Sequence, residues 1–132
     1  MEAFKNNETH FKCVSLEAKN VSSDSIPSGK CLHKIVYFDD SIYSFGGYSQ
    51  IPPMYADRYL KELWKFNLSS QTWEKIPLRG ESPPALAGHT AQFMMIPKKS
   101  KIPFSTTSSK TEPKLVVYGG HDGTNCSTEI AS

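Results

Sequence analysis

Histidines and cysteines are the first candidates for chemistry, because these side chains bind metals and act as bases or nucleophiles. The chain has four histidines and three cysteines, namely His10, His33, His89, His121, Cys13, Cys31 and Cys126. No two of them have the spacing of a zinc site, and an odd number of cysteines without a CxxC pair indicates free thiols in a reducing compartment. We therefore expect no metal centre, no disulfide framework and no cofactor.

Two short motifs also bear on catalysis. Residues 119–123, Gly-Gly-His-Asp-Gly, superficially resemble a phosphate-binding loop, but neither a Lys-Ser/Thr pair nor a helix start follows them. The neighbouring carboxylates Asp39 and Asp40 could act as an acid–base pair, yet their place between two apolar stretches favours a hairpin turn. We predict no catalytic residues and no enzymatic activity.

Aromatic and arginine side chains on two loops are the better candidates for function. Tyrosine and arginine are common anchors of protein interfaces, and loops on a rigid sheet frame often carry binding residues. One long loop follows the first doubled glycine, and a shorter loop follows the second. We predict that these loops bind a protein partner through Tyr48, Tyr55, Arg58, Tyr59, His121 and Asp122. The alternative is that Tyr48 and Tyr59 pack only against their own sheet.

Composition and charge narrow the class of protein. The chain has 132 residues and a formal net charge of +2, so one small domain is expected, with no electrostatic attraction to nucleic acid or to anionic membranes. No apolar run approaches the ~18 residues of a membrane span, and the N-terminus lacks the apolar core of a signal peptide. We expect a cytoplasmic protein and interpret four Asn-x-Ser/Thr sequences, at Asn7, Asn20, Asn67 and Asn125, as chance. The basic stretch 98–101 could be a weak nuclear signal, although a solvated segment is the simpler interpretation.

Alternating apolar residues and turn chemistry predict an all-β chain. The stretch 63–76 reads as a hairpin in which Trp64 and Phe66 precede the turn and Trp73 follows it. Residues 32–38 and 42–45 form a second hairpin signal around Asp39, and 90–96 and 115–118 are further strands. The stretch from 56 to 64 also fits helical spacing, but the alternation after Trp64 favours a loop followed by a strand.

Two segments are expected to be irregular. Residues 1–25 have few apolar side chains in any pattern and should form a loose arm with at most one short strand, around Phe11 to Leu16. The segment 97–113 is rich in proline, serine, threonine and lysine and buries too little to offset its ordering entropy, so we predict a disordered insertion.

An internal repeat unifies these elements. Residues 27–33, of pattern Pro-x-x-Lys-x-x-His, match residues 83–89, Pro-x-x-Leu-x-x-His, at an offset of 56. Residues 42–47 match residues 115–120, each ending in Gly-Gly, at an offset of 73. The two offsets differ by 17, the length of the 97–113 segment. One unit of about 56 residues therefore begins twice, and the second copy carries an insertion.

This unit resembles the kelch repeat, a four-stranded blade of a β-propeller. The resemblance covers 27–123 and rests on features in the expected order: Gly46, Gly47, Trp64, Trp73, a proline-rich loop, His89, Gly119 and Gly120. It implies glycines where backbone or an aromatic ring comes close, a Trp73 ring buried between blades, and structural roles for His33 and His89. One departure is that kelch repeats often have arginine where Leu86 stands, and Lys30 matches it only in part, so the polar contacts of that arginine are in doubt.

The resemblance also implies architecture and function. We expect a 1–25 arm and an incomplete propeller over 26–132, with one full blade at about 31–76 and a partial blade at about 88–120. An incomplete propeller leaves sheet faces and edges uncovered, which favours aggregation of the isolated chain. The implied function is a non-enzymatic interaction module of a substrate receptor for a cullin–elongin ubiquitin ligase, with elongin bound only by a full-length form. The alternatives are an actin-associated kelch scaffold and, remotely, a galactose-oxidase-like enzyme.

Overall fold

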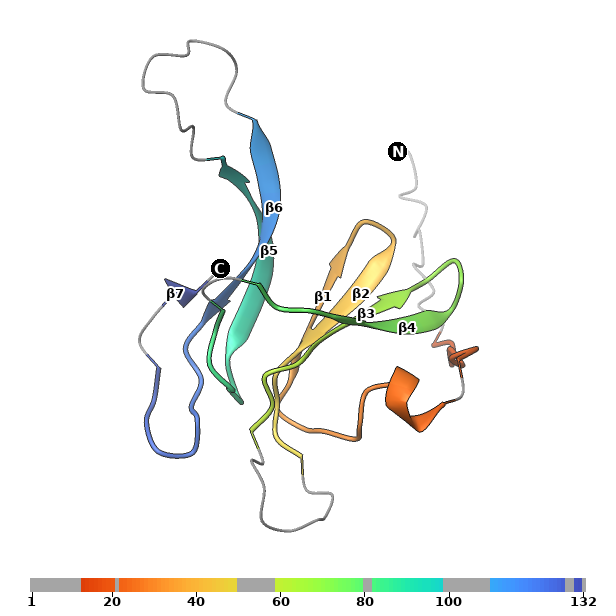
Figure 1. The fold of residues 1–132 in the computed structure, drawn as a ribbon, viewed down its shortest axis with the longest axis horizontal. Helices are drawn as coiled ribbons and strands as arrows, with labels where there is room; N and C mark the ends of the chain where they lie inside the picture. The colour runs from red at the N-terminus through yellow and green to blue at the C-terminus, as the bar shows by residue number, and fades with distance from the viewer. Residues whose placement is uncertain are drawn as a thin grey trace, which may run out of the picture.

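The computed structural model describes residues 13–20, 22–49, 59–79, 82–98, 110–127 and 130–131. These residues form two antiparallel sheets and one short 3-10 helix, η1 (Ser23–Ser25) (Figure 1). The strands are β1 (Lys34–Phe38), β2 (Ser41–Phe45), β3 (Leu63–Asn67), β4 (Thr72–Ile76), β5 (Thr90–Pro97), β6 (Thr111–Tyr118) and β7 (Ile130–Ala131). The predicted all-β class is confirmed, and the ambiguous stretch before β3 is not helical where it is described.

The first sheet is a four-stranded meander in the order β1-β2-β3-β4. Its register sets Ile42 opposite Phe66, and Phe66 opposite Trp73, on one face. Its two tight turns use residues with positive φ, Asp39 (+47°) and Gln71 (+56°) among them. Asp39 and Asp40 therefore form the predicted hairpin turn, in a conformation that short polar residues tolerate well.

The second sheet has the order β5-β6-β7 and extends further than the sequence predicts. Pro97 pairs with Thr111, and Met95 pairs with Pro113, so both ends of the predicted 97–113 insertion belong to the hairpin. Pro113 is tolerated because β7 pairs only with Val117 and Tyr118 and leaves this part of β6 open on one side. The strand β7 also extends this sheet beyond the partial blade predicted at about 88–120. Residues 99–109 of the insertion lie outside the described residues.

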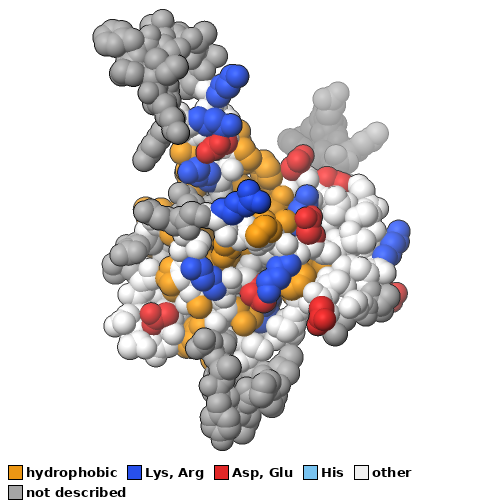
Figure 2. Space-filling model, in the orientation of Figure 1, with side chains coloured by type: hydrophobic (Ala, Val, Ile, Leu, Met, Phe, Trp, Pro, Cys, Tyr) orange, Lys and Arg blue, Asp and Glu red, His pale blue; other side chains and the backbone are white. Residues whose placement is uncertain are grey.

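The two sheets pack face to face around a small apolar core. Phe45 of the first sheet meets Val117 and Ala91 of the second and the connecting residue Leu86, and all four are buried. Phe93 of β5 stacks on Phe38 at 4.6 Å and meets Tyr43 edge-on at 4.8 Å, between ring centroids. In Figure 2 hydrophobic side chains form a band through the middle of the visible face, flanked by charged side chains.

The internal repeat is present in the backbone. Cys31 and Tyr48 exchange two hydrogen bonds, of 2.9 and 2.8 Å between nitrogen and oxygen, and Ala87 and His121 exchange two of 3.0 Å. The two pairs are related by the offsets of 56 and 73 residues found in the sequence. The second glycine of each pair also approaches a backbone oxygen at a similar distance in both units. A Cβ on Gly47 would lie 2.9 Å from the Cys31 oxygen, and one on Gly120 would lie 2.8 Å from the Ala87 oxygen.

The tryptophans differ from the expectation in one respect. Trp64 of the central strand β3 is 4 % exposed; its indole Nε1–H donates to Glu62 Oε2 at 3.1 Å, and the Lys75 ammonium lies over its ring. Trp73, which the sequence places between blades, is only half-buried and tilts against Phe66, with ring centroids 5.0 Å apart. The reason is topological: β4 is the edge strand of its sheet, so Trp73 has a neighbouring strand on one side alone.

In the described part of the N-terminal segment, residues 13–16 form no strand and residues 23–25 form η1. The segment nevertheless lies along the free edge of β4. The backbone N–H of Lys19 donates to the Gln71 carbonyl at 2.8 Å. Asn20 donates from Nδ2 to the Trp73 carbonyl, and its Oδ1 accepts the Trp73 N–H, both at 2.9 Å. In the part of the chain described by the structure, no helix is long and apolar enough to cross a membrane.

Replacing Gly46 by alanine should destabilise the fold far more than replacing its repeat-equivalent, Gly119. Both have positive φ, +62° and +71°, which costs an L-residue about 1–2 kcal/mol. A Cβ on Gly46 would also lie 2.6 Å from the Leu86 oxygen, whereas one on Gly119 meets no described atom within 4 Å. Urea unfolding should show a further loss of about 1–3 kcal/mol for Gly46→Ala. Equal losses would contradict the close packing of the two units.

Acid should weaken the fold through His89. This ring is 5 % exposed and lies edge-on to Phe45, and among the described residues neither of its nitrogens makes a hydrogen bond of good geometry. Burial, aided by nearby Lys34, lowers the pKa of His89 below its ordinary 6.5. The unfolded chain then binds a proton that the folded chain does not, so stability falls as pH drops below about 6.5.

The measurement is the thermal midpoint between pH 7.5 and 5. His89→Gln should flatten this dependence more than His33→Gln, since His33 also has a lowered pKa but is exposed. An unchanged slope in His89→Gln would show that other groups carry the effect.

Candidate protein-interaction site

Two loops on the same end of the sheets bring three predicted residues together (Figure 1). Tyr48 follows the doubled glycine after β2, Tyr59 precedes β3, and His121 follows the doubled glycine after β6. Tyr48 is bridged to Tyr59, and His121 is bridged to Cys126, as isolated antiparallel pairs. The loops are therefore held by backbone hydrogen bonds at their bases, and their side chains project from fixed positions.

Tyr59 lies between the two repeat-equivalent side chains. Its ring centroid is 5.3 Å from that of Tyr48 and 5.3 Å from that of His121, with both contacts edge-on. The Tyr59 hydroxyl and His121 Nδ1 are 3.2 Å apart and share a hydrogen bond. All three side chains are half-buried, so each is positioned by packing and still presents part of its surface to solvent. We name Tyr48, Tyr59 and His121 the aromatic triplet.

The loop after Gly120 is ordered by Asp122. Its Oδ1 accepts the backbone N–H groups of Thr124 and Asn125, both at 2.8 Å. These hydrogen bonds, led by that of Asn125, lower the pKa of the exposed Asp122 carboxyl. Gly123 follows at φ +99°, and a Cβ there would lie 2.6 Å from Cε2 of Tyr59. Asp122 therefore shapes the loop that lets Tyr59 approach it, and also places a negative charge beside the triplet.

The other predicted residues fall into two groups. Tyr55 and Arg58 lie outside the described residues, whereas the structural residues Gly46, Gly47, His89, Gly119 and Gly120 lie at the sheet ends described above. The described residues hold no group of three or more His, Cys, Asp or Glu side chains suited to a metal ion. The described cysteines, Cys13, Cys31 and Cys126, are exposed free thiols.

Leu86 and Lys30, which stand where kelch repeats often have arginine, have different surroundings in the structure. Leu86 is 3 % exposed and belongs to the apolar core between the sheets. Lys30, its partial counterpart in the first unit, instead ends in a buried ammonium that has no hydrogen-bond partner among the described residues. From the sequence, Lys30 is only a partial match to the kelch arginine, and neither Lys30 nor the buried Ser44 is predicted as a site residue, because the burial of their polar atoms depends on the fold.

Comparison with known proteins agrees with this geometry. Residues 29–77, which span the first sheet, match the Kelch motif. With its paired glycines and four-stranded meander, the first sheet is a kelch-type blade, and the second sheet is an incomplete one. A stretch of 58 residues is 36 % identical to kelch domain-containing protein 3 of Rattus norvegicus, Mus musculus and Homo sapiens. This stretch covers 44 % of the chain and 14 % of the length of each of those relatives.

The contribution of the Tyr59–His121 hydrogen bond to the free energy of unfolding can be measured by substitution. Tyr59→Phe keeps both edge-on ring contacts and removes only the hydroxyl, so it should cost about 0.5–1.5 kcal/mol of unfolding free energy. His121→Phe should cost a similar amount, and the double substitution should cost less than the sum of the two.

The exposed Tyr118→Phe is the control and should change stability by no more than about 0.5 kcal/mol. Strict additivity of Tyr59→Phe and His121→Phe would mean that the two side chains do not interact in solution.

Proposed function

We propose that this chain is a non-enzymatic kelch-repeat module that binds a protein partner through the aromatic triplet. The observation that carries the proposal is the position of Tyr59 between Tyr48 and His121, which joins two consecutive units at one end of the sheets. Half-buried aromatic side chains held by backbone pairs lose little entropy on binding, which is the property of an interface anchor. Asp122 beside them favours a partner with a basic or hydrogen-bond-donating group.

We further propose that the full-length protein is a substrate receptor of a cullin–elongin ubiquitin ligase and acts in the cytoplasm. The likeness that supports this runs from Gly46 to Tyr48 and from Tyr59 to Asn67, which resemble the first blade of kelch domain-containing protein 10. In this proposal the triplet contacts the substrate, and elongin binds a helical segment elsewhere in the full-length protein. An actin-associated scaffold would use the same surface without elongin.

Site-specific cross-linking tests the interaction. A photoreactive phenylalanine at position 48 should capture a discrete partner in cells, and the same group at the exposed Tyr37 on β1 should not. Tyr59→Ala should reduce the captured amount about tenfold or more, because losing an interface anchor typically costs 2 kcal/mol or more. Capture that is equal at both positions, or unchanged by Tyr59→Ala, would refute the proposed surface.

Co-precipitation from cells tests the ligase role separately. The full-length protein should recover elongin with or without Tyr59→Ala, while the ubiquitylated partner should be lost in Tyr59→Ala alone. Failure to recover elongin would rule out the ligase role, and recovery of actin in its place would favour the scaffold. Neither result affects the cross-linking test.

A further inference from the structure

The second hairpin is longer than the repeat requires. The hairpin β1–β2 has five residue pairs and closes in a tight turn, whereas β5–β6 has eight. At the repeat offsets of 56 and 73 residues, the first hairpin corresponds to residues 90–94 and 114–118 of the second. Residues 95–98 and 110–113 are therefore additional, and we name them the hairpin extension. It adds about 10 Å of ladder, and the ends of β5 and β6 stand clear of the first sheet in Figure 1.

Neither a neighbouring unit nor the aromatic triplet accounts for the hairpin extension. A further blade built like the first sheet would cover β5 and β6 only as far as residues 94 and 114. The triplet lies at the other end, because it follows Tyr118 at the last residue of β6, whereas the extension includes Thr111 at the first. The extension is thus a surface separate from the proposed interaction site and from the contacts between units.

Two prolines close the free edges of the hairpin extension. The Lys98 N–H donates to the Lys110 carbonyl at 2.9 Å, so these residues form a hydrogen-bonded pair, and alternate residues from there direct their backbone groups outward. Pro97 of β5 and Pro113 of β6 occupy such outward positions, and proline has no N–H to offer another strand. Proline on an edge prevents pairing with a further chain. A partner must therefore bind the extension through its side chains.

The two faces of the hairpin extension differ. Phe93 of β5 faces the first sheet, where it stacks on Phe38, so Met95, two residues later, continues that face. The even-numbered residues lie on the opposite, outer face. An ion pair of 3.4 Å between Lys98 Nζ and Glu112 Oε2 joins the two strands across this outer face. Figure 2 shows basic side chains gathered along the hairpin.

The outer face holds like charges in an unfavourable arrangement. Lys98 and Lys110 lie directly opposite each other in the ladder, a position at which like charges destabilise a sheet. Glu112 pairs with Lys98, but within the described ranges neither Lys110 nor Lys114, at the base of the extension, forms an ion pair. Ile96, opposite Glu112, adds apolar surface among these cations. An acidic ligand would relieve the repulsion between the lysines.

We propose that the outer face of the hairpin extension binds an acidic segment of a protein partner. Two carboxylates of that segment bind Lys98 and Lys110, and an apolar side chain between them rests on Ile96. A single-stranded nucleic acid fits less well, because the described residues of this face include no aromatic ring on which a base could stack. The binding is independent of the aromatic triplet and goes beyond the function proposed for it.

The test uses the 132-residue chain with ¹³C-labelled methyl groups in isoleucine and methionine, and the peptide acetyl-Glu-Glu-Val-Glu-Glu-amide as the probe. The Ile96 signal, assigned by Ile96→Val, should move on titration in a saturable manner. The Met95 signal, assigned by Met95→Leu, should stay in place, because that side chain lies on the other face. The same peptide with glutamine in place of glutamate should bind at least tenfold more weakly. This comparison needs no change to the lysines.

Substitutions separate the hairpin extension from the charge of the whole chain. Lys98→Gln/Lys110→Gln should weaken binding of the acidic peptide at least tenfold. Lys34→Gln/Lys61→Gln removes the same charge from exposed positions outside the extension and should leave binding unchanged. Glu112→Gln should strengthen binding severalfold, because it removes the carboxylate that competes for Lys98. The thermal midpoint of Lys98→Gln/Lys110→Gln should not fall, since a like-charge pair is lost, so weaker binding would not reflect unfolding.

Several outcomes would overturn the proposal. These are equal binding of the glutamate and glutamine peptides, equal losses in the two double variants, and a Met95 signal that moves as far as that of Ile96. Tighter binding of single-stranded oligothymidylate at Ile96 would make nucleic acid the ligand instead. An Ile96 signal that moves with protein concentration in the absence of peptide would make a second copy of the chain the occupant.

Discussion

The close passage of the first doubled glycine beside the second unit is the contact on which the two-sheet arrangement depends. The N–H of Gly47 donates to the Leu86 carbonyl at 2.8 Å, and the space at the Cα of Gly46 is filled by that carbonyl and by the His89 ring. This approach sets the distance between the sheets and lets Phe45 reach Val117 and Ala91. Side chains at these glycines would hold the units apart and open the core.

The close approach of the two units also places the residues of the candidate interaction site next to one another. Because Gly47 and Gly120 occupy equivalent places, the residues after them, Tyr48 and His121, leave their sheets at corresponding points. Tyr59 then fills the distance between them. A binding surface at this end is thus a product of the repeat, and its composition depends on which side chains follow each glycine pair.

The sequence predicts those features that are repeated or that alternate. Two matched stretches with Gly-Gly and histidine indicated the unit, and the alternation around Trp64 and Phe66 indicated its central strand. The extent of β6 and the pairing of Ile130 were missed, because the ladder through Pro113 depends on β5 rather than on local preference. The burial of Trp64 in place of Trp73 depends on strand order, which alternation does not reveal.

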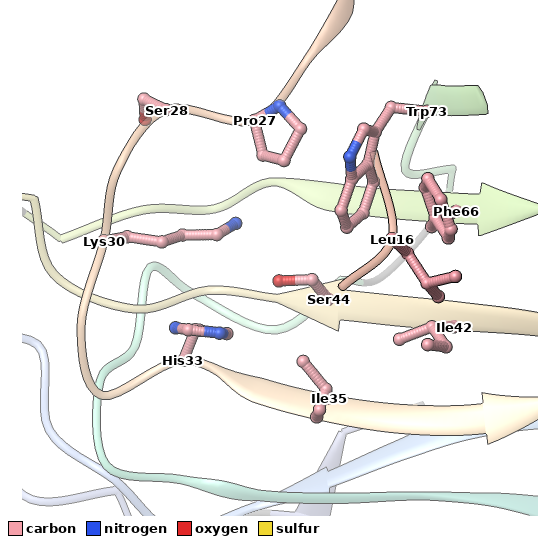
Figure 3. A pocket seen from close by; sticks show the side chains of 10 residues that line it. All are labelled: Leu16, Pro27, Ser28, Lys30, His33, Ile35, Ile42, Ser44, Phe66 and Trp73. Atoms are coloured by element: carbon pink, nitrogen blue, oxygen red, sulfur yellow. The ribbon is translucent and has the colours of Figure 1, made fainter. Parts of the chain in front are cut away.

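The pocket on the face of the first sheet that points away from the second sheet illustrates what a single sequence cannot show (Figure 3). Lys30 stands in the repeated Pro-x-x-Lys-x-x-His pattern and Ser44 in the second strand, and neither pattern reveals that the two side chains line one cavity. Neither Lys30 Nζ nor Ser44 Oγ has a hydrogen-bond partner among the described residues, and the sequence gives no sign of this. The sequence predicted Tyr48 and His121 because each directly follows a glycine pair, and it predicted Tyr59 because that tyrosine lies on the loop between Gly47 and β3.

The hydrogen bonds of Asn20 are incompatible with use of its Asn-x-Ser sequence as a glycosylation site. Both Nδ2 hydrogens are occupied, one by the Ser25 carbonyl and one by the Trp73 carbonyl, while Oδ1 holds the Trp73 N–H. A sugar attached at Nδ2 would displace one of these hydrogens and detach the segment from β4. The Asn20 amide pairs with the free edge of β4 in the way that a fifth strand would. An oligosaccharide on Asn20 is therefore incompatible with this pairing.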